Sequence, residues 1–251
     1  VYVPSCTNRI FGTAADGPKS RAGDISAHRP WVVEALVAVS ARAGLPVWIP
    51  PDVAGSCCGL PWSSKGFGDA HRHKANEMVE RLWRWSGEGA LPVVVDAASC
   101  TGSIADPGDG VLSEQNAERL GKLEILDSVA WAHDRLLPWL EVGEKIGSAT
   151  VHPTCATRHM GLTHRLGALA EALADDVFVP PTATCCGFAG DRGISHPELT
   201  AAATRPEASE VASRHFDARL SSNRTCEIAL ERATGEPYES VIALLERLTR
   251  V

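Results

Sequence analysis

All eight cysteines of this chain fall into one pattern that occurs twice. In each copy a single cysteine is followed by a Cys-Cys-Gly unit and then by another single cysteine. The first set is Cys6, Cys57, Cys58 and Cys100, and the second set is Cys155, Cys185, Cys186 and Cys226. Four thiols per copy is the number that a metal centre held entirely by thiolates requires. The pattern therefore indicates a metal or iron–sulfur protein built from two related halves.

The repeat extends beyond the cysteines. Residues 3–9 (VPSCTNR) align with 152–158 (HPTCATR), residues 56–59 (SCCG) align with 184–187 (TCCG), and Ser99-Cys100 aligns with Thr225-Cys226. The first copy is longer between its first cysteine and its Cys-Cys-Gly unit, and the Gly-containing stretch from Phe11 to Gly23 is the expected insertion. A duplication of this length predicts two tandem repeats, residues 1–149 and 150–251.

Length and composition narrow the class of protein. A chain of 251 residues suits one large or two small domains, and 44% hydrophobic with 22% charged residues is ordinary for a globular protein. No apolar run approaches the ~20 residues of a membrane helix. The formal charge of −7 argues against a nucleic-acid binder. Because the chain starts at Val1 without Met and directly in a strand-like run, we expect a fragment of a longer protein.

Disulfides are the main alternative to metal ligation. A domain of this size can bury a sufficient core without them, and neighbours such as Cys57 and Cys58 pair with each other only under strain. Because the number of cysteines is even, four disulfides between other pairs remain possible. A zinc finger or ribbon is disfavoured, because its ligands come in C-x-x-C pairs and this sequence has none.

Apolar periodicity predicts strands and helices that alternate in both halves. Expected strands are 1–4, 46–50 and 91–96 in the first half, and 149–152, 177–179 and 218–221 in the second. Expected helices are 30–43, 69–85 and 125–137, then 163–174, 198–213 and 238–248, with 138–148 as the boundary. This alternation predicts an α/β fold of two pseudo-symmetric parallel-sheet lobes. Each cysteine or cysteine pair follows a strand, and loops at the carboxyl ends of parallel strands converge at one sheet edge.

Two further pairs of residues repeat near the Cys-Cys-Gly units. Gly59 and Gly187 are expected to let backbone N–H groups approach cofactor sulfurs. Lys65 and Arg192 follow at similar distances, and either they offset the negative charge of a thiolate-bound cluster or they are solvated loop charges.

The histidines and two of the tryptophans are interpreted as structural residues rather than as ligands. His152 stands where the first copy has Val3, so we expect a buried strand histidine with satisfied hydrogen bonds. His71 and His73 are two apart on an expected helix and are interpreted as surface residues. Trp83 and Trp85 are interpreted as packing residues or a docking face.

The double Cys…Cys-Cys-Gly…Cys pattern resembles the cysteine-rich CCG domain. That domain occurs in heterodisulfide reductase, in iron–sulfur subunits of glycolate oxidase and anaerobic glycerol-3-phosphate dehydrogenase, and in lactate-utilisation proteins. Residues 185–193 (CCGFAGDRG) and 222–228 (SNRTCEI) are most similar to the C-terminal region of bacterial FAD-linked D-lactate dehydrogenase-like oxidoreductases. The resemblance covers nearly the whole chain, from Val3 to about Leu248.

The resemblance implies an oxidoreductase with FAD and ferredoxin-like domains upstream of Val1. It implies that flavin oxidises a D-2-hydroxy acid and that this region relays electrons to an acceptor such as a quinone or cytochrome, in the cytoplasm or at the inner face of the membrane. The fullest form of the family ends each motif in C-x-x-C, whereas this chain has Ser103 and Ala229 at those places. Four thiolates per copy still suffice for a 4Fe–4S cluster.

Three functions from different classes therefore stay open. The first is an iron–sulfur electron-transfer module without substrate chemistry of its own and with no catalytic residues. The second is a thiol–disulfide or zinc-binding reductase module that uses the adjacent thiols. The third is a structural docking domain whose metal sites have degenerated.

Overall fold

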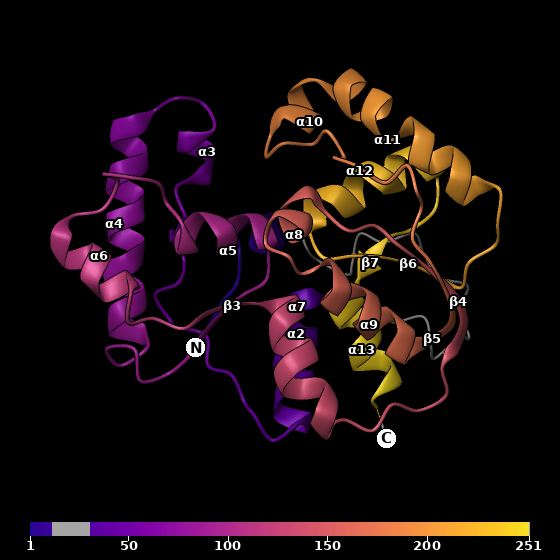
Figure 1. The fold of residues 1–251 in the computed structure, drawn as a ribbon, viewed down its shortest axis with the longest axis horizontal. Coiled ribbons are helices and arrows are strands. Elements are labelled where there is room, and N and C mark those ends of the chain that lie inside the picture. The colour runs from indigo at the N-terminus through magenta and orange to yellow at the C-terminus, as the bar shows by residue number, and fades with distance from the viewer. Residues whose placement is uncertain (12–30, 251) are drawn as a thin grey trace.

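The computed structural model describes residues 1–11 and 31–250, so the expected insertion from Phe11 to Gly23 lies almost wholly outside the described residues. The chain forms two parallel sheets (Figure 1). The first has the order β1 (Tyr2–Val3), β2 (Val93–Val95), β3 (Ile125–Asp127). The second has the order β5 (Ala174–Phe178), β4 (Ile146–Val151), β6 (Ala218–Ser221), β7 (Glu239–Ser240). The predicted fold class, two parallel-sheet α/β lobes, is confirmed.

Helices occur in the same order in both halves. The first half contains α1 (Cys6–Phe11), α2 (Val32–Arg42), α3 (Leu60–Ser63), α4 (Gly68–Trp85), α5 (Ala98–Ala105) and α7 (Ser128–Trp131). Their counterparts are α8 (Cys155–His159), α9 (Thr163–Leu173), α10 (Arg192–Ser195), α11 (Pro197–Ala212), α12 (Arg224–Thr234) and α13 (Val241–Leu248). The first half adds α6 (Glu114–Leu120), and α7 continues into a π turn (Ala132–Leu136) and a 3-10 turn (Leu137–Trp139). This correspondence supports the duplication.

The expected strand 46–50 is wrong. The segment runs beside β1, where the N–H of Tyr2 donates to the carbonyl of Trp48 at 2.8 Å, but it forms no strand. Pro46 and Pro50 lack the N–H groups that a ladder needs. The segment still occupies the place that β5 has in the second half.

Two expected helices begin with short strands instead. Residues 125–137 open with β3 and residues 238–248 contain β7, and only then do α7 and α13 start. Asp127 caps α7 by accepting from the N–H of Val129 at 2.9 Å, and Ser240 caps α13 by accepting from Ile242 at 3.3 Å. Strands of two or three residues are too short to show alternation, so the apolar pattern of the following helix dominated the sequence signal.

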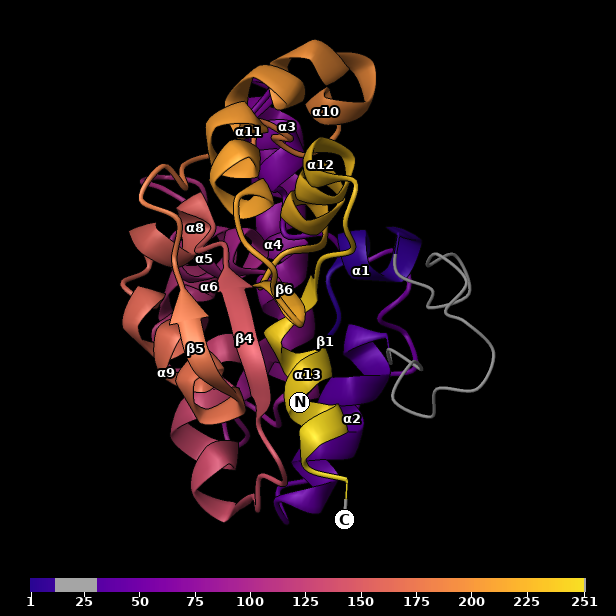
Figure 2. The ribbon, with the colours of Figure 1, turned by 90° about the vertical axis from the view of Figure 1, so that its right-hand side faces the viewer.

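The main hydrophobic core belongs to both halves. It contains Leu36 of α2, Val129 of α7, Leu166 of α9 and Leu244 of α13, all fully buried. Helix α13 packs against α2, α7 and α9. Figure 2 places α2 and α13 at one end of the molecule and α10, α11 and α12 at the other, with β4 and β5 pointing toward the second end. The two lobes therefore share one core at the end away from the carboxyl ends of these strands.

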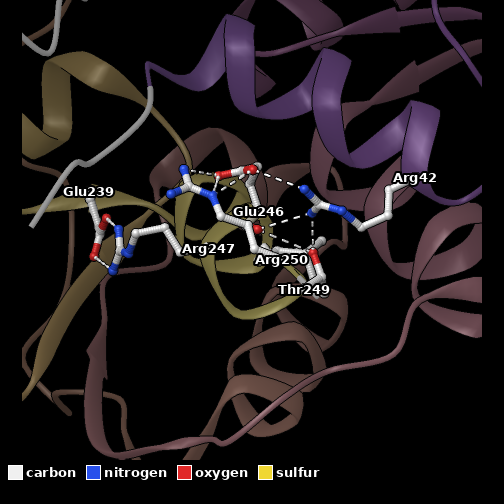
Figure 3. A network of polar contacts seen from close by, with 7 residues as sticks. Arg42, Glu239, Glu246, Arg247, Thr249 and Arg250 are labelled. Carbon is white, nitrogen blue, oxygen red and sulfur yellow. Dashed lines mark hydrogen bonds and ion pairs between the residues drawn. The ribbon is translucent and has the colours of Figure 1, made fainter. Parts of the chain in front are cut away.

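Ion pairs reinforce that junction (Figure 3). Glu246 of α13, a largely buried carboxylate, accepts from Arg42 of α2 at 3.1 Å and from Arg250 at 2.6 Å. Arg42 also donates to the hydroxyl of Thr249 at 2.6 Å. These contacts tie the last helix to the first long helix. In the described ranges, no helix has the length and apolar content needed to cross a membrane.

Candidate metal centre

The structure brings the first cysteine set together around one pocket. Cys6 is the first residue of α1, Cys57 and Cys58 lie in the loop before α3, and Cys100 lies on α5. All four line the same small cavity of about 20 Å³. The Cys57 thiol donates to Cys58, and the Cys58 thiol donates to Cys100. Cysteines that follow β1, the segment 46–50 and β2 in the sequence thus meet at one edge of the sheet.

The second set converges in the equivalent place. Cys155 is the first residue of α8, Cys185 and Cys186 lie between β5 and α10, and Cys226 lies on α12. The sulfurs of Cys186 and Cys226 are 2.9 Å apart. The Cys155 thiol hydrogen-bonds to Cys185, and both act electrostatically on Cys226. Each predicted set is therefore assembled, and metal ligation by these thiols stays a prediction.

Both Cys-Cys-Gly units form the same turn. Gly59 and Gly187 have φ of 86° and 70°, in the left-handed region that favours glycine. The N–H of Gly59 points to the sulfur of Cys57 at 3.5 Å, and the N–H of Gly187 points to that of Cys185 at 3.4 Å. These N–H groups approach cysteine sulfurs, and their approach to the sulfurs of a bound cofactor stays a prediction. The next N–H in each turn, of Leu60 or Phe188, reaches the second sulfur of the pair.

The two sets differ in acidity. A hydrogen bond to the next thiol raises the pKa of Cys57 and of Cys58, and burial raises that of Cys6. In the second set, the hydrogen bond from Cys155 lowers the pKa of Cys185 to about 5. Cys155 and Cys185 are also exposed, whereas their counterparts in the first copy are half-buried. The second set is thus more open to solvent and holds the more readily ionised thiol.

Polar clusters that the sequence reasoning missed hold the first cysteine of each set in place. Asp96, buried at the end of β2, accepts from the hydroxyl of Tyr2 at 2.5 Å and from the N–H of Ser5 at 2.7 Å. In the second copy the hydroxyl of Thr157 on α8 lies 3.0 Å from that of Ser222, which follows β6. Asp96 and Ser222 occupy aligned positions, four residues before Cys100 and Cys226. A polar residue at this position in both copies is the sequence signal from which these clusters could have been predicted.

The predicted cations have different surroundings. The ammonium of Lys65 lies 2.7 Å from a carboxylate oxygen of Asp191, so it bridges the loops that follow the two Cys-Cys-Gly units. Figure 1 shows α3 and α10, next to this bridge, facing each other at the top of the molecule. Arg192 is exposed at the start of α10. A role for either cation in offsetting cluster charge stays a prediction.

The interpretation of His71 as a surface residue is wrong. The side chain is buried, and its Nδ1 lies 3.2 Å from the carbonyl of Gly59 in the first Cys-Cys-Gly turn. His71 falls on the buried face of α4 with Ala75 and Met78, whereas His73, one-half turn away, is exposed as expected. The helix face, set by the core, decided which histidine supports the site.

Packing also accounts for the two tryptophans of α4. Trp85 is buried and donates its indole N–H to Asp52 at 2.8 Å, and Trp83 is partly buried with the Lys122 ammonium 5.9 Å from its ring. The packing interpretation holds for Trp85.

The two sites meet across the junction of the lobes. Helix α5, which carries Cys100, contacts α8, which begins with Cys155. By the same symmetry α1, which begins with Cys6, contacts α12, which carries Cys226. The amide of Asn223 donates to the hydroxyl of Ser99 at 3.3 Å and links the two halves beside the cysteines.

Comparison with known proteins gives the family. Residues 24–105 and 149–231 each match the cysteine-rich domain called CCG, and together they make up more than half of the chain. The chain belongs to the cysteine-rich domain (CCG) family. Comparison with curated proteins found no match. The first match starts after Cys6, whereas the second includes Cys155, and the equivalent places of α1 and α8 support the alignment of these two cysteines that residues 3–9 and 152–158 gave.

Membership of this family supports a metal- or redox-related module, of a kind found in oxidoreductase-associated proteins. Within the described ranges, no three side chains of His, Cys, Asp or Glu surround a point as a single metal ion requires. The donor chemistry of each set, four cysteine thiols with N–H groups directed at the sulfurs, fits an iron–sulfur cluster, which takes its thiolates on separate iron atoms.

Proposed function

We propose that each cysteine-rich domain holds one iron–sulfur cluster, of the 4Fe–4S type, and that the chain is an electron-transfer module. The observation that carries this proposal is the convergence of four thiols in each of two equivalent places. Cys6, Cys57, Cys58 and Cys100 would bind one cluster, and Cys155, Cys185, Cys186 and Cys226 the other. We take residues 1–149 and 150–251 as the two repeats, although β4 already begins at Ile146.

The protein's own groups suit such a role. N–H groups at sulfur stabilise added negative charge and tune the reduction potential, and both Cys-Cys-Gly turns supply them. Contacts of α5 with α8 and of α1 with α12 bring the two sites to a common junction. Bound clusters would exchange one electron each, which suits the division of a two-electron flavin reduction between two carriers.

The wider context follows from the family resemblance. We propose that the parent protein oxidises D-lactate or a related D-2-hydroxy acid at an FAD, and that this module passes the electrons to an acceptor such as a quinone or cytochrome. Substrate chemistry then lies in the FAD domain, and this module contributes no catalytic residue. Cytoplasmic location, or attachment at the inner face of the membrane, is part of the same proposal.

Anaerobic purification with iron and sulfide analysis tests cluster binding. We expect a brown protein with broad visible absorbance at about 400 nm, as thiolate-bound iron–sulfur clusters show. Cys58→Ala or Cys186→Ala should lose iron from one site. Ser209→Ala is the control, because Ser209 is exposed on α11, where its hydroxyl donates to the carbonyl of Arg205 in the same helix, and its loss should leave iron content unchanged. In the complete protein, the cysteine variants should keep flavin reduction by substrate and lose electron delivery to the acceptor. Full delivery without iron in this module would refute the relay.

A second candidate is a thiol–disulfide reductase module. It is favoured by the exposed Cys185, whose pKa is lowered to about 5 by its hydrogen bond from Cys155. A low pKa makes a thiolate available as a nucleophile at neutral pH. A colourless protein that contains no iron and reduces a disulfide with loss of two thiols would support this candidate against the first.

A further inference from the structure

A buried histidine–glutamate pair lies beside the second cysteine set. His152, 1% exposed, follows β4 and is three residues before Cys155. Its Nδ1 lies 2.9 and 2.8 Å from the two carboxylate oxygens of Glu207 on α11, which is 3% exposed. Because a carboxylate accepts hydrogen bonds, Nδ1 carries the proton, and the ring orientation is fixed by both oxygens.

The other ring nitrogen has no hydrogen-bond partner among the described residues. His152 Nε2 is buried, and a buried nitrogen without a partner is unfavourable. In the first copy the aligned residue, Val3, lines the cavity that the four cysteines share, so the position of His152 borders the second cysteine set. The expectation of a fully satisfied strand histidine is therefore half correct: Glu207 satisfies one nitrogen and leaves the other available.

We propose that His152 is a positioning residue whose Nε2–H donates a hydrogen bond to the sulfur-rich group held by the second cysteine set, and that this gives the second centre a higher reduction potential than the first. The inference rests on the proposed function. With Nδ1–H donated to Glu207 and Nε2–H donated to the site, the pair is an imidazolium and a carboxylate with no net charge. A hydrogen bond donated by Nε2–H stabilises the extra negative charge of the reduced state.

The first copy has no hydrogen-bond donor in the side chain at the equivalent position. Val3 stands at the position of His152 and presents only methyl groups. Among the residues that the structure describes, Arg9 in the first copy is matched by Arg158 in the second. Lys74 acts on Cys57, but it is paired with Glu77 at 2.7 Å.

Solvent exposure acts in the same direction as the histidine. Cys155 and Cys185 are exposed, whereas Cys6 and Cys57 are half-buried, and exposure to water also favours the more highly charged reduced state. Electrons therefore pass from the first centre to the second.

Redox titration followed by EPR tests the proposal in the anaerobically purified full chain. Cys58→Ala leaves only the second centre and Cys186→Ala leaves only the first. In the second-centre background, His152→Val should lower the equilibrium constant for reduction by about tenfold or more, which is a fall in reduction potential of about 59 mV for a one-electron couple. In the first-centre background the same change should have no effect. His73→Val, at an exposed site on α4, is the control substitution and should shift neither potential.

Two amide variants separate hydrogen bonding from packing. Gln places its amide nitrogen near the position of Nε2, whereas Asn places it near Nδ1. His152→Gln should therefore restore most of the potential and His152→Asn should not. With ¹⁵N-labelled histidine, pulsed EPR of the reduced second centre should show a weak nitrogen coupling that His152→Val abolishes.

Several results would overturn the proposal. These are an unchanged potential in His152→Val, equal shifts in all three variants, a strong coupling from a directly bound nitrogen, or failure of the second centre to assemble in every variant. A wild-type chain with two redox centres that ignore His152 refutes this inference alone. A wild-type chain that forms no iron–sulfur centre refutes the proposed function.

Discussion

Replacement of Gly187 by Ala should destabilise the second cysteine-rich domain through the Cys-Cys-Gly turn. The residue has φ of +70°, and an added Cβ would lie 3.0 Å from the Cβ of Ala203, 3.1 Å from the carbonyl oxygen of Leu199 and 3.2 Å from the Cα of Thr200. Two of these atoms belong to the backbone of α11 and cannot rotate away. Gly190, with φ of +74° and no atom within 4 Å of an added Cβ, is the matched control.

The two variants share one cost and differ in another. An alanine in the left-handed region costs about 1–2 kcal/mol, partly offset by about 0.4–1 kcal/mol from the stiffer unfolded chain. Gly190→Ala should therefore lose about 1 kcal/mol of unfolding free energy. Gly187→Ala adds the overpacking against α11, which costs about 1–3 kcal/mol more. It also displaces the N–H that points to the sulfur of Cys185.

Urea unfolding followed by circular dichroism measures the two free energies under identical conditions. We expect Gly187→Ala to be the less stable variant by at least about 1 kcal/mol, and iron content should fall in that variant alone. Equal stability of the two variants, or greater loss in Gly190→Ala, would show that the contact of the turn with α11 does not constrain it.

Three other substitutions, one of them with a matched control, test the electrostatics. Burial raises the pKa of Asp127 from 3.8 to about 7. Between these two pH values the folded chain keeps a proton that the unfolded chain releases. The free energy of unfolding therefore falls by roughly 1 kcal/mol per pH unit as the pH rises through this range. Asp127→Asn, which keeps the cap of α7, should be as stable as wild type at about pH 4 and more stable at about pH 8, on either side of the pH range over which the proton is lost. A difference in stability that stays constant across pH would contradict this. Glu246→Ala should cost about 2 kcal/mol in urea unfolding, because Arg42 and Arg250 both lose their carboxylate partner. Its control, Glu236→Ala at an exposed site, should cost less than about 0.5 kcal/mol, and similar losses in the two variants would contradict the role of the buried network. Lys65→Met should leave the unfolding midpoint unchanged, because both partners of its ion pair are exposed to solvent, and a clear drop would assign the bridge a role in holding the lobes together.

Much of the site followed from the sequence for a local reason. A cysteine directly after a strand lies at the carboxyl end of that strand wherever the strand sits, so the repeated order of Cys155, Cys185 and Cys226 predicted one convergent set. Gly187 followed in the same way, because a tight turn that directs an N–H back to a preceding sulfur needs a positive φ. The duplication itself needed only the comparison of residues 3–9 with 152–158.

Pairing and burial, by contrast, depend on partners distant in sequence. β3 is a strand because it pairs with Val93–Val95. Its three residues are too few to show the alternation that would predict a strand from the sequence. His71 supports the first Cys-Cys-Gly turn because the core fixes which face of α4 is inward. The sequence by itself determined the two four-thiol sets, their glycine turns and the α/β order. Only the tertiary structure decided that the lobes share one core, that Lys65 meets Asp191, and that one nitrogen of His152 has no partner among the described residues. Each of these depends on how segments distant in sequence pack against each other, which the burial of apolar surface drives.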